Sequence, residues 1–139
     1  DAGDLGQVVE LVGGVDRDVV GACCKPRVAG AGWVGVPLDG GLVDGDLHEM
    51  RRIGFGMVRV SRSCAMRMSE AHASNAIRLT SGASAGELVP QVFEAVPDPE
   101  TRALVGVDYT FSDRWRALGG RVWMHAGARV GHIGAHVFR

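Results

Sequence analysis

The chain has 139 residues, 46% of them hydrophobic, which is enough to form one core of ordinary domain size. Fifteen basic against sixteen acidic residues give a formal charge of −1, which argues against a nucleic-acid partner. There is no apolar run of membrane-spanning length and no secretory signal pattern, and the three cysteines contain no Cys-x-x-Cys pair. These features predict a soluble, cytoplasmic chain.

The first quarter of the chain has the pattern of a helix followed by a buried strand. Asp4 is placed to cap the helix, with Gln7 as its capping-box partner, and Gly13-Gly14 provides the stop. Residues 18–24, apolar from Val19 onward, predict a buried strand. The glycine-rich residues 28–36 predict a weak strand or a loop.

The middle of the chain predicts a hairpin, a strand, a short helix and a long loop. Asp44-Gly45 is a tight-turn signal between residues 42–43 and 46–50. A strand is expected over 56–60, and Ser63 is expected to cap a short helix that carries Ala65, Met68 and His72. Residues 74–100, rich in glycine, serine and proline, predict a loop of the length that is usually a lid or disordered.

The last third places an acidic residue ahead of an amphipathic helix. Phe111, Trp115 and Leu118 recur at helical spacing, and Gly119-Gly120 ends the pattern. A strand over 121–126 follows, with Val122, Met124 and Ala126 on one face. Asp108 therefore lies at the helix N-terminus, where backbone N–H groups keep a carboxylate ionised, as a general base needs. The alternative is that Asp108 only caps the helix.

Several segments, in order, resemble the C-terminal half of GT-A fold glycosyltransferases of the family 2 type. They are Asp108-Tyr109 with Phe111, the run 114–120 (Arg-Trp-Arg-Ala-Leu-Gly-Gly), Val122-Trp123 and 132–134 (His-Ile-Gly). Further back, 18–22 with 25–27 resembles the strand and loop after the family's acidic metal motif. Residues 53–58 resemble its glycine-bearing segment near the donor and the acceptor.

The resemblance implies an α/β fold, with a GT-A-like mixed β-sheet flanked by helices. Residues 1–139 would be a single domain, the C-terminal portion of a nucleotide-diphospho-sugar transferase fold that lacks its N-terminal nucleotide-binding strands. The implied function is metal-dependent transfer of a sugar from a nucleotide-sugar donor to a hydroxyl of a glycan or another acceptor. The alternative is a non-catalytic GT-A-like remnant that acts as a binding or structural module. A histidine-rich metal hydrolase is a third interpretation, but it would need a second carboxylate cluster that the sequence does not show.

Site residues also follow from the resemblance. Asp108 aligns with the family's catalytic base, although Val107 stands where the family has a glutamate. Asp1 aligns with the second aspartate of the Asp-x-Asp motif and, with His132, would bind Mn²⁺ or Mg²⁺. A distorted motif spanning residues 1–4, with Asp4 as a ligand rather than a cap, remains open.

Three further residues are expected to bind substrate. Gly54 and Gly56 would let the backbone approach the sugar because no Cβ intrudes, while a strand bulge is the alternative explanation. Arg114 would reach a phosphate of the donor.

Overall fold

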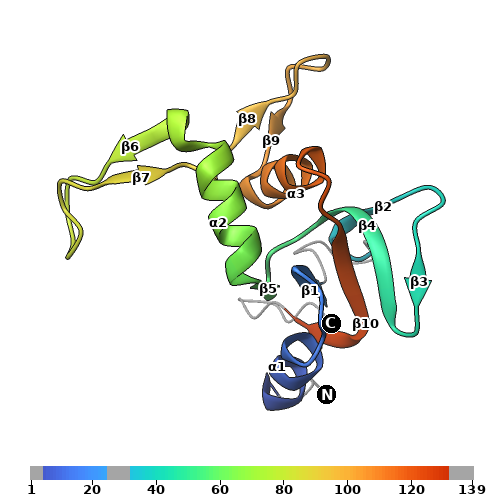
Figure 1. The fold of residues 1–139 in the computed structure, drawn as a ribbon. Helices are drawn as coiled ribbons and strands as arrows, with labels where there is room; N and C mark the ends of the chain where they lie inside the picture. The colour runs from blue at the N-terminus through green and yellow to red at the C-terminus, as the bar shows by residue number, and fades with distance from the viewer. Residues whose placement is uncertain (1–4, 25–31, 132–139) are drawn as a thin grey trace.

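The computed structural model describes residues 5–24 and 32–131 and shows a mixed α/β fold built on a six-stranded sheet (Figure 1). The strand order is β2-β4-β10-β1-β5, with β3 paired to β4. Only β1 and β10 run parallel among these pairs; the other described pairings are antiparallel. The strands are β1 (Val19–Cys24), β2 (Gly35–Pro37), β3 (Val43–Asp44), β4 (Leu47–Ile53), β5 (Val58–Val60) and β10 (Val122–Val130).

Strand β1 lies between β10 and β5 in the sheet and is buried along its whole length. Its neighbours Val19 and Val20 point to opposite faces, as successive residues of a strand must. Val19 belongs to the cluster under helices α2 (Arg62–Ala71) and α3 (Val107–Ala117). Val20 belongs to the cluster under α1 (Leu5–Gly13). The sheet is therefore covered by helices on both faces, which explains why the sequence of β1 is continuously apolar.

Helix α1 confirms the helix expected before Gly13-Gly14. Its buried residues Val8 and Val12 pack against Val20 and Trp123. Asp4, the expected cap, lies outside the described residues. No helix in the described ranges is long and apolar enough to cross a membrane.

Helix α2 begins two residues earlier than expected. Ser61, not Ser63, is its N-cap, and the Ser61 hydroxyl accepts a hydrogen bond from the Cys64 N–H at 3.0 Å. The Ser61 hydroxyl also donates to the Asp18 carboxylate at 2.5 Å, which fixes the end of β5 against the start of β1. Met68 of α2 is buried, as expected for a residue on the core-facing side of the helix, and His72 is the C-cap.

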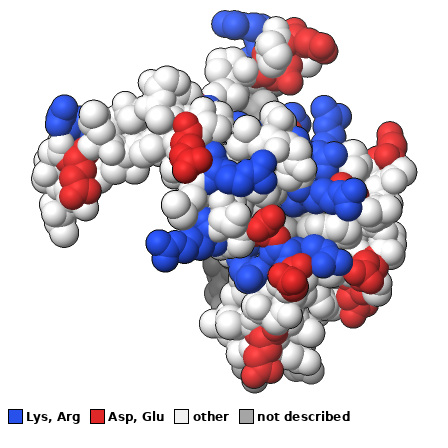
Figure 2. Space-filling model, in the orientation of Figure 1, with Lys and Arg blue, Asp and Glu red and all other residues white. Residues whose placement is uncertain are grey.

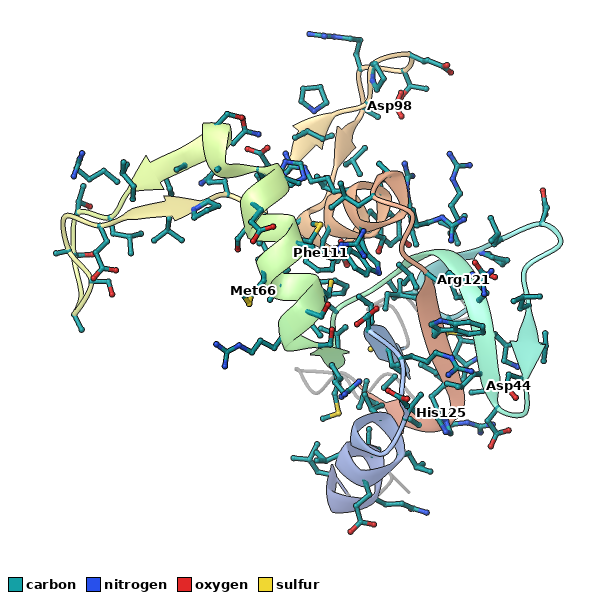
Figure 3. All side chains as sticks on the ribbon, in the orientation of Figure 1. Asp44, Met66, Asp98, Phe111, Arg121 and His125 are labelled. Carbon is teal, nitrogen blue, oxygen red and sulfur yellow. The ribbon has the colours of Figure 1, made fainter. Side chains whose placement is uncertain are left out.

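Helix α3 and the turn after it agree with the sequence prediction. Phe111 and Trp115 are buried in the core (Phe111 is labelled in Figure 3). Gly119 has a φ of 82°, the left-handed conformation that ends a helix. A Cβ on Gly120 would lie 2.1 Å from the Trp115 ring, so the second glycine is required by packing.

Strand β10 is longer than the expected 121–126. Val122 and Met124 share the core face under α3, as predicted. The partner of β1 jumps from His125, opposite Ala22, to Arg129, opposite Cys23, so residues 126–128 bulge out of the parallel pairing. His125 is buried beside this bulge, and its Nδ1 accepts the Gly127 N–H at 3.2 Å.

The prediction of a long loop over residues 74–100 is wrong. This segment contains a 3₁₀ helix and most of two hairpins, β6–β7 and β8–β9, which extend from the body in Figure 1. The predicted hairpin at Asp44-Gly45 is confirmed, with Asp44 opposite Leu47. The additional elements are η1 (Ala73–Asn75), β6 (Ala76–Arg78), β7 (Leu88–Pro90), β8 (Val96–Pro97) and β9 (Leu104–Val105).

Candidate functional site

Asp108 lies inside the first turn of α3. The N-cap is Gly106, so Asp108 is not the helix cap that the alternative interpretation required. Its Oδ1 accepts the backbone N–H of Tyr109 at 2.9 Å, while Oδ2 accepts no hydrogen bond from the described part of the chain. The N–H groups of a helix's first turn have no partner within the helix, and this end of the helix dipole attracts negative charge. One oxygen is thus held in place and the other is available to a ligand.

The first turn of α3 lies beside the end of β1. The Val34 N–H donates to the Cys24 carbonyl at 2.8 Å, and a Cβ on Gly54 would meet both Val34 and Oδ2 of Asp108. Burial raises the pKa of the Cys24 thiol, and the Asp108 carboxylate contributes to the rise. Asp108 is therefore near the carboxyl end of a parallel strand, where open α/β sheets commonly bind ligands.

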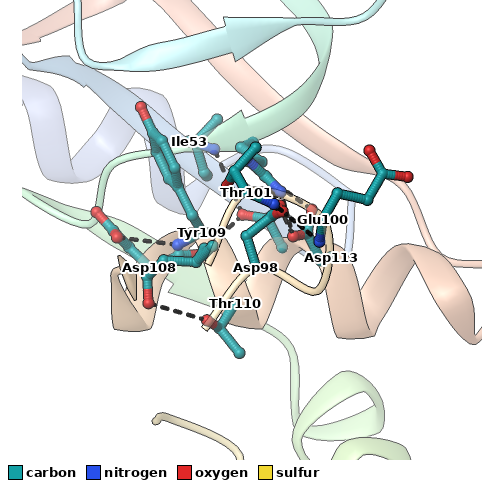
Figure 4. Close-up of polar contacts among 11 residues, drawn as sticks. Ile53, Asp98, Glu100, Thr101, Asp108, Tyr109, Thr110 and Asp113 are labelled. Atoms are coloured by element: carbon teal, nitrogen blue, oxygen red, sulfur yellow. Dashed lines mark hydrogen bonds and ion pairs between the residues drawn. The ribbon is translucent and has the colours of Figure 1, made fainter. Parts of the chain in front are cut away.

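A pocket of about 460 Å³ opens in front of Asp108. Its floor comes from α3 and β4, and its opposite side comes from the β8–β9 turn, which carries Asp98 and Thr101 (Figure 4). Three hydrogen bonds to Asp98 Oδ1 hold this turn: from the Glu100 N–H, the Thr101 N–H and the Thr101 hydroxyl. The pocket is lined by Val34, Arg52, Asp98, Thr101, Ala103, Leu104, Val105, Gly106, Asp108 and Tyr109.

Arg52 and Tyr109 are pocket residues that sequence reasoning missed. Arg52 binds Asp113 of α3 through both carboxylate oxygens, and this pairing raises the pKa of the guanidinium. The guanidinium also lies 5.7 Å from the centre of the Tyr109 ring, a cation–π contact. Burial raises the pKa of the Tyr109 hydroxyl, and the neighbouring Asp108 carboxylate adds to the rise.

Gly54 and Gly56 are both needed by the packing of the chain itself. A Cβ on Gly54 would lie 2.5 Å from Cγ1 of Val34, and a Cβ on Gly56 would lie 2.2 Å from Sγ of Cys24. Both glycines lie in the connection between β4 and β5. The expected approach of a sugar to these glycines stays a prediction, and Gly54 is the nearer of the two to Asp108 by these contacts.

Arg114 is tied to the segment before β8. It donates to the Gln91 carbonyl at 2.8 Å and forms an ion pair with Glu94. Phe93 of the same segment stacks on Phe111 at 4.8 Å between ring centres. Arg114 thereby anchors this segment on α3, and its expected contact with a phosphate stays a prediction.

Asp1 and His132, the expected metal ligands, lie outside the described residues. Within residues 5–24 and 32–131, no group of three or more His, Cys, Asp and Glu side chains could hold a metal ion. Asp98 and Asp108 line one pocket, but two carboxylates alone leave a divalent cation mostly ligated by water.

Comparison with protein-family models, with curated proteins and with solved structures gives no match for this chain.

Proposed function

We propose that this chain is the acceptor-side part of a GT-A-type glycosyltransferase domain, in which Asp108 is the general base. The observation that carries the proposal is the geometry of Asp108. One carboxylate oxygen is fixed by the Tyr109 N–H, and the other accepts no hydrogen bond from the described residues of a pocket of about 460 Å³. An ionised, oriented and accessible carboxylate is what removal of a proton from a hydroxyl requires.

In the proposed reaction, the acceptor hydroxyl donates its proton to Oδ2 of Asp108. The acceptor oxygen then forms a bond to the anomeric carbon of the donor sugar, and the bond from that carbon to the diphosphate breaks. The nucleoside diphosphate leaves with the bonding electron pair, so its developing charge must be neutralised. Asp1 and His132, which would hold the divalent cation, lie outside the described residues; a cation bound there would supply this neutralising charge.

A second candidate is a non-catalytic binding module of the same fold, favoured by two observations. Val107, beside Asp108, is 47% exposed, so an apolar side chain faces solvent where the resemblance implies a glutamate. Arg52, which lines the pocket, is already paired with Asp113, and Arg114 of α3 is already paired with Glu94. A donor phosphate would have to compete with those carboxylates.

The two candidates are separated by measuring nucleotide release with Asp108→Asn. The assay uses UDP-glucose, GDP-mannose and dTDP-rhamnose in turn, with Mn²⁺ and a mixture of oligosaccharide acceptors. The substitution removes the proton acceptor at nearly constant size, so acceptor-dependent release should fall by about 10²- to 10⁴-fold while donor binding survives. Asp39→Asn, at an exposed turn outside the pocket lining, is the matched control. Equal release by Asp108→Asn and wild type would contradict the assignment, and donor binding without release would favour the binding module.

The metal is tested separately by calorimetric titration of Mn²⁺ into wild type and His132→Ala. We expect weaker binding by the variant, and equal affinities would remove His132 from the site.

A further inference from the structure

A second hollow lies at the other end of α3 from Asp108. Its volume is about 750 Å³, and it shares no lining residue with the pocket at Asp108. Helix α3 has 11 residues and therefore spans about 16 Å between its ends. The hollow is bounded by Gly119 and Gly120 after α3, by the residues before β1, and by the starts of α2 and β10. It is a separate site and does not depend on the proposed function.

Arginines dominate the polar lining of this hollow. Four arginines line it against three aspartates: Arg17, Arg59, Arg67 and Arg121 against Asp16, Asp18 and Asp44. On the face seen in Figure 2, blue arginine groups lie close together near the middle, with acidic groups between them. Arg121 and Asp44 are both labelled in Figure 3; Arg121 lies just before β10, and Asp44 lies in β3.

Two of these arginines are held in place by tryptophans. The guanidinium of Arg67 lies 4.9 Å from the centre of the Trp115 ring, and that of Arg17 lies 5.3 Å from the centre of the Trp123 ring. Both tryptophans also line the hollow, and both rings are almost fully buried, so each guanidinium packs on a ring that the core holds in place. Stacking of this kind orients the planar fork before any ligand arrives, which reduces the entropy lost on binding.

The hollow has more hydrogen-bond donors than acceptors. Arg67 donates to the Leu118 carbonyl, and Arg59 donates to the carbonyls of Val15 and Arg17, with one nitrogen each. Every guanidinium has five N–H donors, so most of them have no acceptor within the described chain. Arg121 is 59% exposed, and its nearest carboxylate, Glu49, is 3.8 Å away.

The carboxylates of the hollow are partly used already. Asp44 accepts from Arg17 at 2.8 Å, and Asp18 accepts from the Ser61 hydroxyl. The negative end of the α3 dipole would repel an anion, but the carbonyls there are occupied. The Trp115 carbonyl accepts from the N–H groups of Leu118 and Gly120, the Arg116 carbonyl accepts from the Gly119 N–H, and the Leu118 carbonyl accepts from Arg67.

From this donor surplus we infer that the hollow binds an oxyanionic group, a phosphate, sulfate or carboxylate of a ligand, with Arg67 and Arg121 as its principal contacts. A guanidinium matches such a group because two parallel N–H donors meet two oxygens.

The test titrates the whole chain with inorganic phosphate and follows the amide signals of Gly119 and Gly120 and the indole signal of Trp115 by NMR. A parallel titration with sodium acetate tests for binding of a carboxylate, and one with methyl glucoside tests for binding of a neutral sugar. Sodium chloride at equal ionic strength is the control for charge screening. We expect saturable shifts with phosphate or acetate, and the stronger of the two identifies the source of the oxyanion. Shifts with methyl glucoside alone, or shifts that chloride reproduces, would overturn the inference.

The variants are Arg121→Gln, at an exposed position, and Arg67→Gln, with Arg62→Gln on the same helix as the control outside the hollow. Arg121→Gln should weaken phosphate binding by about tenfold, the size of a hydrogen bond to a charged group. Arg62→Gln and Asp108→Asn should leave binding unchanged. Because Arg67 stacks on Trp115, Arg67→Gln could also destabilise the fold. Its phosphate affinity is therefore compared only if its melting curve matches that of the wild type. If it does not, Arg121→Gln alone tests the inference. Unchanged affinity in Arg121→Gln would contradict the assignment.

Discussion

Arg52 binds Asp113 through both of its carboxylate oxygens, with N–O distances of 2.7, 2.8 and 3.1 Å. The pair joins β4 to α3 across 61 positions of sequence. It sets how α3 lies over the connection that contains Gly54, and thus where the first turn with Asp108 sits relative to the pocket.

We expect Arg52→Lys to destabilise the fold by about 1 kcal/mol, because an ammonium cannot reproduce the bidentate geometry and the pair is partly exposed. Urea unfolding of Arg52→Lys, Asp113→Asn and the double variant measures the coupling energy of the two side chains. Arg51→Lys, on the neighbouring exposed arginine, is the control. Additive effects of the two single substitutions would show that the pair contributes nothing as a unit.

Gly56 is expected to be intolerant of a side chain because of Cys24. The Sγ atom would lie 2.2 Å from the new Cβ, and both residues are held by the surrounding strands. Gly56→Ala should cost about 1 to 3 kcal/mol of unfolding free energy, as overpacking of a core does. The double variant Gly56→Ala with Cys24→Ala removes the clashing sulfur and should recover part of that loss. A double variant no more stable than Gly56→Ala would mean that backbone conformation, not contact with Cys24, requires the glycine.

The pKa of Cys64 predicts a loss of stability at alkaline pH. Burial raises this pKa from 9.0 to about 12, and Asp18 adds to the rise. Above pH 9 the unfolded chain has lost the thiol proton while the folded chain keeps it, so stability must fall as pH rises. The slope is about 1.4 kcal/mol per pH unit for one such group, until the folded thiol also ionises.

Unfolding by urea at several alkaline pH values measures this slope. Cys64→Ala should have a shallower slope than wild type, whatever its own stability. A thiol reagent should also fail to label Cys64 in the folded chain and label it in urea, because the side chain is fully buried. Equal slopes for the two proteins, or rapid labelling of the folded chain at Cys64, would contradict the prediction.

The elements that could be predicted from the sequence are those whose pattern lies within a few neighbouring residues. The Gly13-Gly14 stop of α1, the apolar spacing of α3, the six-residue apolar run of β1 and the Asp44-Gly45 turn are all signals carried by nearby residues alone. Strands β6 and β7 have only three residues each, too few for alternation to show between turn-forming residues. The sequence alone does not distinguish Ser61 from Ser63 as the N-cap of α2, because serine caps equally well at either position. The hydrogen bond to Asp18, which is distant in sequence, favours Ser61.

The same limit applies to the candidate site. The position of Asp108 at the start of a helix could be predicted, because Phe111 and Trp115 mark that helix locally. Arg52, Asp98 and Tyr109 come to the pocket from separate elements, and their meeting depends on how β4 and the β8–β9 hairpin pack on α3. Nothing in the sequence around Arg52 identifies Asp113 as its partner. The sequence predicts that Gly54 and Gly56 are positions where a Cβ would intrude. The side chains that occupy the space of such a Cβ are those of Val34 and Cys24.

The turn of the β8–β9 hairpin should loosen at acidic pH because of Asp98. Hydrogen bonds from the Thr101 N–H and hydroxyl, and from the Glu100 N–H, hold the pKa of this carboxyl below its usual range. For a lowered pKa, the stabilisation is present above the ordinary aspartate value and is lost as pH falls through the lowered value. The Thr101 amide signal should therefore move on acidification with the same midpoint as the Asp98 carboxyl, as NMR titration can measure.

The variant that tests this explanation is Thr101→Val, which removes the hydroxyl donor at nearly constant volume but keeps the backbone N–H. The pKa of Asp98 should then rise toward its ordinary value, and the turn should loosen at a higher pH than in wild type. Thr80→Val, outside this turn, is the matched control and should leave the Asp98 titration unchanged. Because Asp98 and Thr101 form the outer side of the pocket at Asp108, ligand binding there should weaken over the same pH range. An Asp98 midpoint that is the same in wild type and Thr101→Val would show that the hydroxyl does not stabilise the carboxylate, and the backbone N–H groups alone would have to account for its lowered pKa.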